Sequence, residues 1–496
     1  MPPNPLMTAG LEERSMFGGT GEKKISKRVH PVYAKYRRLY GFWRNSYEGG
    51  QDYCKKYLQT HRLESNDDYS KRIERSYFLN YTRNIVDIWT NALFRAGVSR
   101  QGETDEGKQF LDDITGKGVR PNSFWKRAST YSSIHGRSYI LIDSPVIDID
   151  RAPAIRTAVY DQQLRPYLKL IAAESFVDWS TDDLGNFNWA LIGLSQTEDK
   201  NPLVARETQE VYLLLEPGKW TLFDSNDKVI DGGETKLDVV PIVIVHHVDF
   251  DENEIGESMI TDISELNRAI FNWTSLLDEI LYMQTFGQLV IAANEGEISQ
   301  KLTGTKRIIT VPKDTPFPPL YISPDASQAG IFIQWIGKSV KEMFRLGFAR
   351  KSGIDDPEQY NTATGKVLDL FDLQQALANK AAALQEADTK VAEIVGKFYG
   401  KTERAYTAVY PTQFDLRTLE GEIEDYAGLK LLDFGTEFNF EMAKKVVAKA
   451  LPHFNQTETD KMFGYVEKWI EKQAQAPEFT TPPNEPTEQP EDKPTV

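Results

Sequence analysis

Residues 256 to 286 read GESMITDISELNRAIFNWTSLLDEILYMQTF, and apolar side chains recur in this stretch at alternating steps of three and four. The series is Ile263, Leu266, Ile270, Trp273, Leu277 and Ile280. Because an α-helix turns once every 3.6 residues, this spacing places these side chains on one stripe of a helix. No proline interrupts the stretch. We therefore predict one long amphipathic helix here.

Two further stretches before Gly400 have the same helical character. One repeats the three-and-four step with Ile333, Ile336, Val340 and Met343. The other repeats at steps of seven, with Leu377, Leu384, Val391 and Phe398. A narrow seven-residue seam suits long helices that pack side by side, from one chain or from several copies. A β-rich insert separates the first two helices and a polar loop the last two, which indicates a scaffold that builds a wall or a tube.

Composition indicates a soluble protein. The chain has 496 residues, which favours about three domains, and its hydrophobic (40%) and charged (26%) fractions are ordinary. Cys54 is the only cysteine, so no disulfide can form within the chain and we expect a reducing compartment. No apolar run approaches the roughly 20 residues that a membrane helix needs, and the N-terminus lacks an apolar signal core. We expect a soluble chain that is made inside the cell.

The net charge of -15 argues against a protein that grips nucleic acid over its whole surface, because affinity for phosphates comes from Lys and Arg. It leaves room for a local basic stripe, and it also fits a channel through which DNA must slide. The plain alternative is that negative charge keeps the protein soluble.

Weaker patterns organise the rest of the chain. We predict helices within Val32–Phe94 (the second run being Tyr69–Phe94) and at Phe110–Ile114 and Phe124–His135, followed by a buried strand at Ser138–Asp143. The strands predicted next are Leu168–Ala172, Trp189–Leu194, Glu210–Leu215, Trp220–Phe223 and Val239–His246. The last predicted helices are Leu419–Leu432, Phe440–Ala450 with Asn439 as its N-cap, and Thr459–Lys472.

Motifs for enzyme chemistry are nearly absent. Gly337-Lys338-Ser339 resembles the end of a phosphate-binding loop, but Phe332 stands where the first glycine should be, and the tripeptide falls inside a predicted helix. His246-His247 ends a predicted strand, where alternation points the two rings to opposite faces. We therefore predict no catalytic residue, no cofactor and no metal.

Several short motifs follow one another in order between Val32 and Thr402. The first group is Trp43, Gly49-Gly50, Tyr57-Leu58, Glu64, Tyr69, Arg72, Asn80 and Phe94. The second is Phe110-Leu111-Asp112-Asp113, Phe124, and Gly136 leading to Ile140-Leu141-Ile142-Asp143-Ser144-Pro145. The last are Val240-Pro241-Ile242-Val243, Gly256-Glu257-Ser258 and Ser352-Gly353. Together with the order helix, insert, helix, loop, helix, this series resembles the portal proteins of tailed bacteriophages.

The resemblance implies an α+β fold that is mainly helical, with a β-rich wing, two long stem helices, a small β-containing clip, a long wing helix and a helical crown. Carried onto this sequence, the segments are a flexible lead at 1–28, a wing at 29–255, a first stem helix at 256–287, a clip at 288–325, a second stem helix at 326–347, a channel loop at 348–365, a wing helix at 366–402, a crown at 403–473 and a disordered Pro-rich acidic tail at 474–496.

The function that this resemblance implies is a ring at one capsid vertex, twelve-fold by family, that conducts DNA during packaging and ejection. The implied partners are double-stranded DNA read without sequence preference, the terminase large subunit, a head-tail adaptor, and capsid and scaffold proteins. The protein is then part of the virion, made in the bacterial cytoplasm, with no membrane partner and no enzyme activity. The alternatives are a multidomain cytoplasmic enzyme whose site one sequence does not reveal, and another virion adaptor or scaffold protein.

Two groups of residues are candidates for contact with DNA. Lys338, Lys341 and Arg345 are spaced three and four apart, which places them on the helix face opposite the apolar stripe of the second stem helix. The predicted lining of the channel is Lys338, Lys341, Arg345, Arg350 and Lys351. The predicted channel loop contains Ser352, Gly353, Asp355, Asp356, Pro357, Glu358, Gln359, Asn361 and Thr362. The alternatives are a solvated outer face for the stripe and a plain surface connector for the loop.

Overall fold

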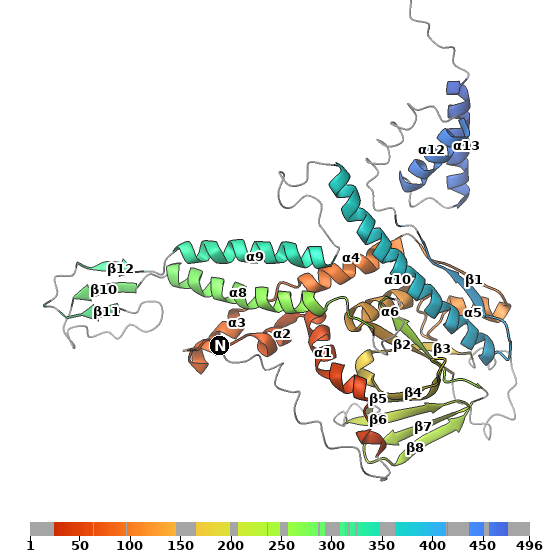
Figure 1. Cartoon of the computed structure of the whole chain (residues 1–496), viewed down its shortest axis with the longest axis horizontal. Helices are drawn as coiled ribbons and strands as arrows, with labels where there is room; N and C mark the ends of the chain where they lie inside the picture. The colour runs from red at the N-terminus through yellow and green to blue at the C-terminus, as the bar shows by residue number, and fades with distance from the viewer. Residues whose placement is uncertain are drawn as a thin grey trace, which may run out of the picture. The chain divides into compact units, whose positions relative to one another are not determined.

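The computed structural model of the chain falls into two compact units, residues 1–414 and 415–496, which are described one at a time. The described residues are 24–62, 64–95, 97–144, 165–198, 207–235, 237–248, 256–285, 288–292, 308–312, 314, 318–322, 326–347, 363–412, 414, 436–450 and 456–474. Helices and strands are mixed within the first unit (Figure 1), which confirms the α+β class.

The first unit begins with a strap and a group of aromatic helices. The strap, η1 (Ile25–Lys27) and the residues around it, is held on a sheet: the Ser26 amide donates to Asp227 Oδ1 (2.7 Å) and Arg28 Nε to Asp178 Oδ2 (2.9 Å). The prediction of a flexible lead is therefore wrong for residues 24–28, while residues 1–23 lie outside the described part. The helices are α1 (Pro31–Glu48), α2 (Gly50–Tyr57), α3 (Asn66–Arg75) and α4 (Tyr81–Arg95).

One predicted helix in this group is wrong. The run predicted from Tyr69 to Phe94 is broken between α3 and α4, because Ser76 ends α3 in an extended conformation and its amide and hydroxyl both donate to the Arg72 carbonyl. The break matters for the site below, because the link from Ser76 to Asn80 passes beside the long helices.

A small antiparallel sheet forms the centre of the first unit, in the order β3 (Tyr167–Ile171), β2 (Arg137–Asp143) and β9 (Ile242–His246). Nearly every residue of β2 is buried, as its continuous apolar run requires. The helix α6 (Pro121–His135) leads into β2, and the short α5 (Asp105–Asp112) precedes it. The predictions of helices ending at Ile114 and His135 and of a strand at Ser138–Asp143 are confirmed within a few residues.

A second sheet has five antiparallel strands in sequence order (Figure 1). They are β4 (Phe176–Thr181), β5 (Phe187–Glu198), β6 (Glu207–Glu216), β7 (Lys219–Asp224) and β8 (Val229–Glu234). The sequence predicted β5, β6 and β7 but missed β4 and β8. Gly232-Gly233 weakens the strand signal of β8, which pairs on one side only, with β7.

Two long helices leave this body as a hairpin, α8 (Thr261–Thr285) and α9 (Ala326–Leu346). Between them in sequence is a three-stranded sheet ordered β11 (Ile308–Val311), β10 (Gln288–Ala292), β12 (Leu320–Ile322). The third long helix, α10 (Ala363–Phe398), packs on β9 and β2 and starts inside the segment predicted as loop 348–365. The three long helices predicted from periodicity are confirmed.

The predicted helical crown at 403–473 begins with a strand instead. The strand β13 (Tyr406–Val409) pairs antiparallel with β1 (Ser99–Gly102), three hundred residues earlier, so it belongs to the first unit. The second unit contains α12 (Thr436–Ala450) and α13 (Gln456–Ala474). Asn439 lies inside α12, so its prediction as the N-cap is wrong. Predicted helix 419–432 and tail residues 475–496 lie outside the described residues.

A buried polar cluster joins β1, α10 and the segment after β13. Asp388 accepts hydrogen bonds from Arg100 Nε (2.8 Å), Tyr406 Oη (2.6 Å) and Tyr410 Oη (3.1 Å). Arg100 also donates to Asn122 Oδ1 (2.5 Å) and Tyr410 Oη (2.7 Å). Both charged side chains are almost fully buried, so each depends on the other for its charge compensation.

A second buried group is Lys380 on α10, which has no carboxylate partner in the described part of the chain. Its Nζ donates to the Ser129 carbonyl and the Ser133 hydroxyl of α6, and the buried His247 is the titratable group nearby. Burial lowers the pKa of Lys380 to about 7, so the amine is about half neutral near pH 7 in the folded protein.

We expect Asp388→Ala to lower the free energy of unfolding by about 3–5 kcal/mol, because it leaves the buried Arg100 unpaired. Urea denaturation measures the change. Glu393→Ala is the matched control on the same helix: it removes an exposed ion pair with Arg404 (3.3 Å) and should cost less than about 1 kcal/mol. Equal losses in the two variants would contradict the role of the buried cluster.

The lowered pKa of Lys380 makes stability depend on pH with a defined sign. Between pH 7 and 10.5 the unfolded chain binds a proton at this site that the folded chain does not, so this residue makes the wild type less stable as pH falls across that range. We expect Lys380→Met to be more stable than wild type by a few kcal/mol, on the order of the pKa shift, at pH 7.5 and nearly equal at pH 10. A difference in unfolding free energy that is the same at both pH values would contradict this.

Candidate functional site: the hairpin of helices α8 and α9

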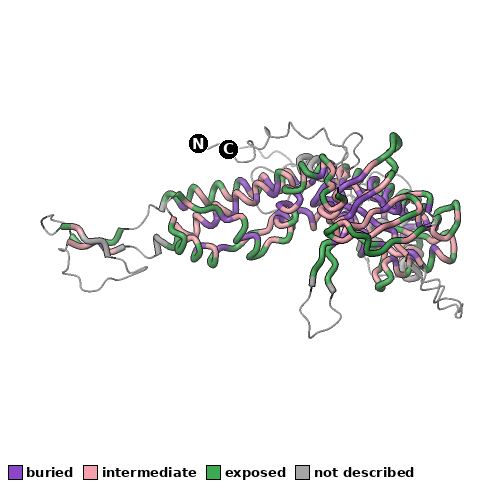
Figure 2. The backbone as a smooth tube through the Cα atoms, turned by 90° about the horizontal axis from the view of Figure 1, so that it is seen from below, coloured by how far each residue is buried: buried purple, intermediate pink, exposed green. Residues whose placement is uncertain are grey.

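The hairpin has a buried side where its two helices meet and exposed residues along its outer sides (Figure 2). On α9 the buried residues are Ala329, Ser339 and Met343, and on α8 Ile263 and Ile270 are almost fully covered. The indole rings of Trp273 and Trp335 meet edge to face with centroids 6.0 Å apart. The side chains that the apolar periodicity placed on one stripe therefore contribute to the contact between α8 and α9.

The base of the hairpin is fixed to the body at both helices. Before α8, the Ser258 hydroxyl donates to the Ile134 carbonyl (2.7 Å), and Gly136 has a φ of +80°. A Cβ on Gly136 would lie 2.1 Å from the Gly256 carbonyl oxygen, so this approach requires glycine. After α9, Trp89 Nε1 of α4 donates to the Gly347 carbonyl (2.7 Å). The orientation of α9 is thus set by the body.

Buried polar side chains hold α8 along its first half. Asn267 Oδ1 accepts from the amide (3.1 Å) and hydroxyl (3.0 Å) of Thr82, and its Nδ2 donates to the Leu79 carbonyl (2.9 Å). Arg72 of α3 binds both oxygens of Glu64 (2.6 and 2.7 Å) and donates to the Ser275 hydroxyl (3.0 Å). The hydrogen bonds from Arg72 lower the pKa of Glu64 to about 2.

The predicted basic stripe is present on the outer side of α9. Lys338, Lys341 and Arg345 are all exposed, on the side of the helix that faces away from Ser339 and Met343. Arg345 donates two hydrogen bonds to Glu342 (2.8 and 2.5 Å), which raise the pKa of the guanidinium. Glu342 therefore neutralises part of the stripe, and its two lysines contribute most of the positive charge.

The apolar stripe of α9 is only partly buried. Met343 is fully covered, but Ile333, predicted on the same packed stripe, is 57% exposed. Ile331 (67%) and Trp335 (50%) are also exposed, and the sequence analysis assigned them no role. Their positions on the helical wheel, outside the buried face, could have predicted that they are exposed.

The other predicted site residues lie outside the described part of the chain. They are Arg350, Lys351, Ser352, Gly353, Asp355, Asp356, Pro357, Glu358, Gln359, Asn361 and Thr362. Their assignment to a channel lining and a channel loop stays a prediction.

Metal binding and membrane spanning can also be judged for the described residues. They contain no group of three or more His, Cys, Asp or Glu side chains arranged to hold a metal ion. None of their helices has the length and apolar character to span a membrane. Gly337-Lys338-Ser339 lies within α9, as predicted, so its amides belong to the helix.

No protein-family model matches this chain, and no curated protein matches it. Solved structures of gene transfer agent (GTA) particles are similar to it at 10% sequence identity. The virion of the native particle gives a TM-score of 0.38 over 81% of this chain and 92% of the other. A chain in the neck of the empty particle, computed with C6 symmetry, gives 0.40 over 73% and 89%. A chain in the neck of the native particle, computed with C12 symmetry, gives 0.36 over 84% and 98%, so the structural neighbours of this chain are virion and neck components of a gene transfer agent.

Proposed function

We propose that the chain is the protomer of a portal ring, which lies at one vertex of a phage capsid and conducts double-stranded DNA during packaging and ejection. The observation that carries the proposal is the hairpin of α8 and α9: a pair of long helices held rigidly at one end, with a basic stripe on the side opposite its buried face. Copies of such a hairpin arranged around an axis form a tube.

In this proposal the basic stripe faces the channel. The chain as a whole carries a charge of -15, so the stripe is a local exception in an acidic protein. Lys338 and Lys341 from every copy would form two stacked rings of positive charge. Contacts between lysines and phosphates are independent of sequence and weaken with salt, which suits DNA that must slide.

The remaining parts take roles by position in the chain. The three-stranded sheet between α8 and α9 is the proposed contact for the terminase large subunit and the head-tail adaptor, and the body contacts capsid and scaffold proteins. A ring of twelve copies follows from the family resemblance. The protein is then a structural component of the virion, and the terminase supplies the energy of packaging.

The expected result for purified protein is a closed ring in negative-stain electron micrographs. Rings should retain linear double-stranded DNA but not a covalently closed circle of the same sequence, because only DNA with ends can thread a channel. Replacing Lys338, Lys341 and Arg345 with Gln should spare the rings, weaken retention of linear DNA and flatten its dependence on salt.

A matched control removes three exposed lysines elsewhere, with Lys117, Lys219 and Lys228 replaced by Gln. Both triple variants change the formal charge from -15 by the same three units, to -18, so general electrostatic effects are equal. Equal losses in the two variants, or equal binding of circular and linear DNA, would place the stripe outside any channel. A compact monomer at micromolar concentration would overturn the ring.

A further inference from the structure

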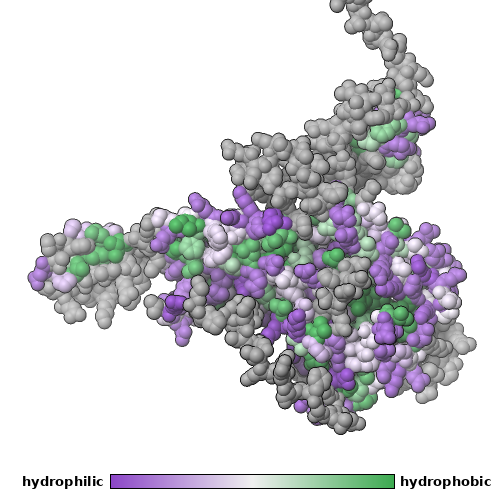
Figure 3. Space-filling view, in the orientation of Figure 1, coloured by the Kyte–Doolittle hydropathy of each residue, from purple (hydrophilic) through white to green (hydrophobic). Residues whose placement is uncertain are grey.

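The hairpin carries an unusual share of the exposed apolar side chains of the described residues. On α9 these are Ile331, Ile333 and Trp335, and on α8 Leu281 and Tyr282. Tyr77 and Leu79, in the link between α3 and α4, lie beside them. Figure 3 shows apolar surface between hydrophilic patches along the two helices. Exposed apolar side chains gathered on one element in this way mark a contact with another protein.

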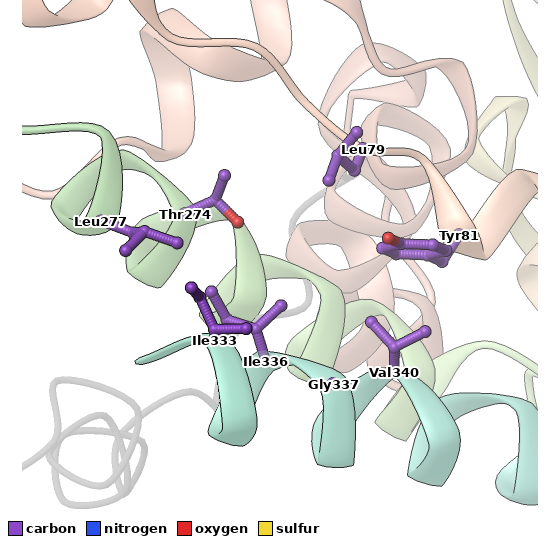
Figure 4. A pocket seen from close by; sticks show the side chains of 8 residues that line it. All are labelled: Leu79, Tyr81, Thr274, Leu277, Ile333, Ile336, Gly337 and Val340. Carbon is purple, nitrogen blue, oxygen red and sulfur yellow. The ribbon is translucent and has the colours of Figure 1, made fainter. Parts of the chain in front are cut away.

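One part of this surface is a hollow of about 360 Å³, which we call the groove. Figure 4 shows Ile333, Ile336 and Val340 of α9 pointing toward Thr274 and Leu277 of α8, toward Leu79 of the link and toward Tyr81 at the start of α4. Gly337 forms part of its floor, and a Cβ built there meets no atom within 4 Å. The groove is open and apolar.

The other part is a pair of side chains, Ile331 and Trp335, which we call the knob. They are one helical turn apart and therefore lie together on α9. At about 100° per residue, the knob lies about 180° around the helix from Ile333, Gly337 and Val340. The same helix therefore presents a protruding apolar pair on one flank and an apolar hollow on the other, with the basic stripe between them.

We propose that the knob of one copy of the chain enters the groove of the next copy, so that copies associate head to tail. This inference rests on the proposed ring and names the contact that closes it. A contact between two different surfaces of the same chain is heterologous, and repetition of such a contact gives a ring or a filament. Trp is among the residues that contribute most to protein interfaces when its ring is seated in a pocket.

Charges beside the two surfaces favour the same occupant. On the helical wheel Glu342 lies between Ile331 and Trp335, at the knob, whereas Lys341 lies next to Gly337, at the edge of the groove. Residues 341 and 342 are at nearly the same height along the helix. The knob side of α9 therefore carries an acidic group, which Arg345 of the same helix binds, and the groove side carries a basic one, so a contact between these two unlike sides avoids opposing like charges.

The contact also explains which side of α9 stays free. The buried face is covered by α8, and the two flanks are covered by neighbours on either side. The side that remains is the one with Lys338, Lys341 and Arg345. A head-to-tail arrangement of this kind therefore directs the basic stripe away from every protein contact and toward the axis or the exterior of the ring.

Three variants separate the knob, the groove and general effects of replacing a helical glycine. The knob variant is Ile331→Ser with Trp335→Ala, and the groove variant is Gly337→Leu, which adds a side chain at the hollow from a position where the Cβ meets no atom within 4 Å. The control is Gly41→Leu in α1, outside the hairpin, where a Cβ also meets no atom within 4 Å. Circular dichroism and thermal unfolding establish that each full-length variant is folded.

We expect the knob variant to weaken association about 30-fold or more, and the groove variant to do the same, while the control forms rings like wild type. Light scattering on a sizing column measures the mass of each species against the 56.5 kDa chain. The decisive sample is an equal mixture of the two defective variants. The groove variant keeps its knob and the knob variant keeps its groove, so the mixture should give one-to-one dimers that cannot grow.

The outcomes distinguish this contact from the ring itself. Three results would overturn the knob and groove: rings like those of wild type in both variants, a mixture that stays monomeric, or an equal defect in the Gly41→Leu control. Open filaments of wild type that both variants abolish would support the contact and overturn the closed ring. A wild type that stays monomeric would overturn both.

Discussion

Two packed helices can bury only the sides that they turn toward each other and toward a third element, and this limit governs the hairpin of α8 and α9. The body covers the base of the hairpin through Asn267, Ser258 and Trp89. Farther along, Ile331, Ile333 and Trp335 stay at least half exposed, although Trp335 meets Trp273 of α8 edge to face. The hairpin is too thin to form a core of its own, so its outer half keeps apolar side chains exposed.

The attachment of the hairpin at its base determines how its exposed outer half is oriented. Hydrogen bonds from buried side chains fix α8, and Trp89 fixes the end of α9, so the orientation of the outer surface is inherited from the body. A surface held in this way can meet an identical copy at one angle, which a closed ring requires. The buried Arg100–Asp388 cluster serves the same end by tying α10 to the sheet of β1 and β13.

Sequence periodicity predicted the long helices because each carries an apolar stripe over many turns, and local patterns of this length are hard to imitate by chance. Periodicity failed for strands that pair with a distant part of the chain and for strands whose residues have low β-propensity. The strand β13 pairs with β1, which no local pattern indicates, and β8 contains Gly232-Gly233. The break between α3 and α4 was missed because aromatic residues continue across it, while the backbone turns extended at Ser76 and ends the helix there.

The candidate site was predictable to the extent that it depends on one helix. The spacing of Lys338, Lys341 and Arg345 fixed their common face, and their exposure follows from the burial of Met343 on the other side. The groove could not be predicted in this way, because Leu79 of the α3–α4 link and Tyr81 of α4 come more than 250 residues before the α9 residues that line it. A wheel of α9 alone shows apolar residues on more than one side, which reads as a broad core face. Only the position of α8 and of the α3–α4 link divides those residues into a packed face, a hollow and an exposed pair, and this division gives the helix the two different surfaces that the proposed head-to-tail contact joins.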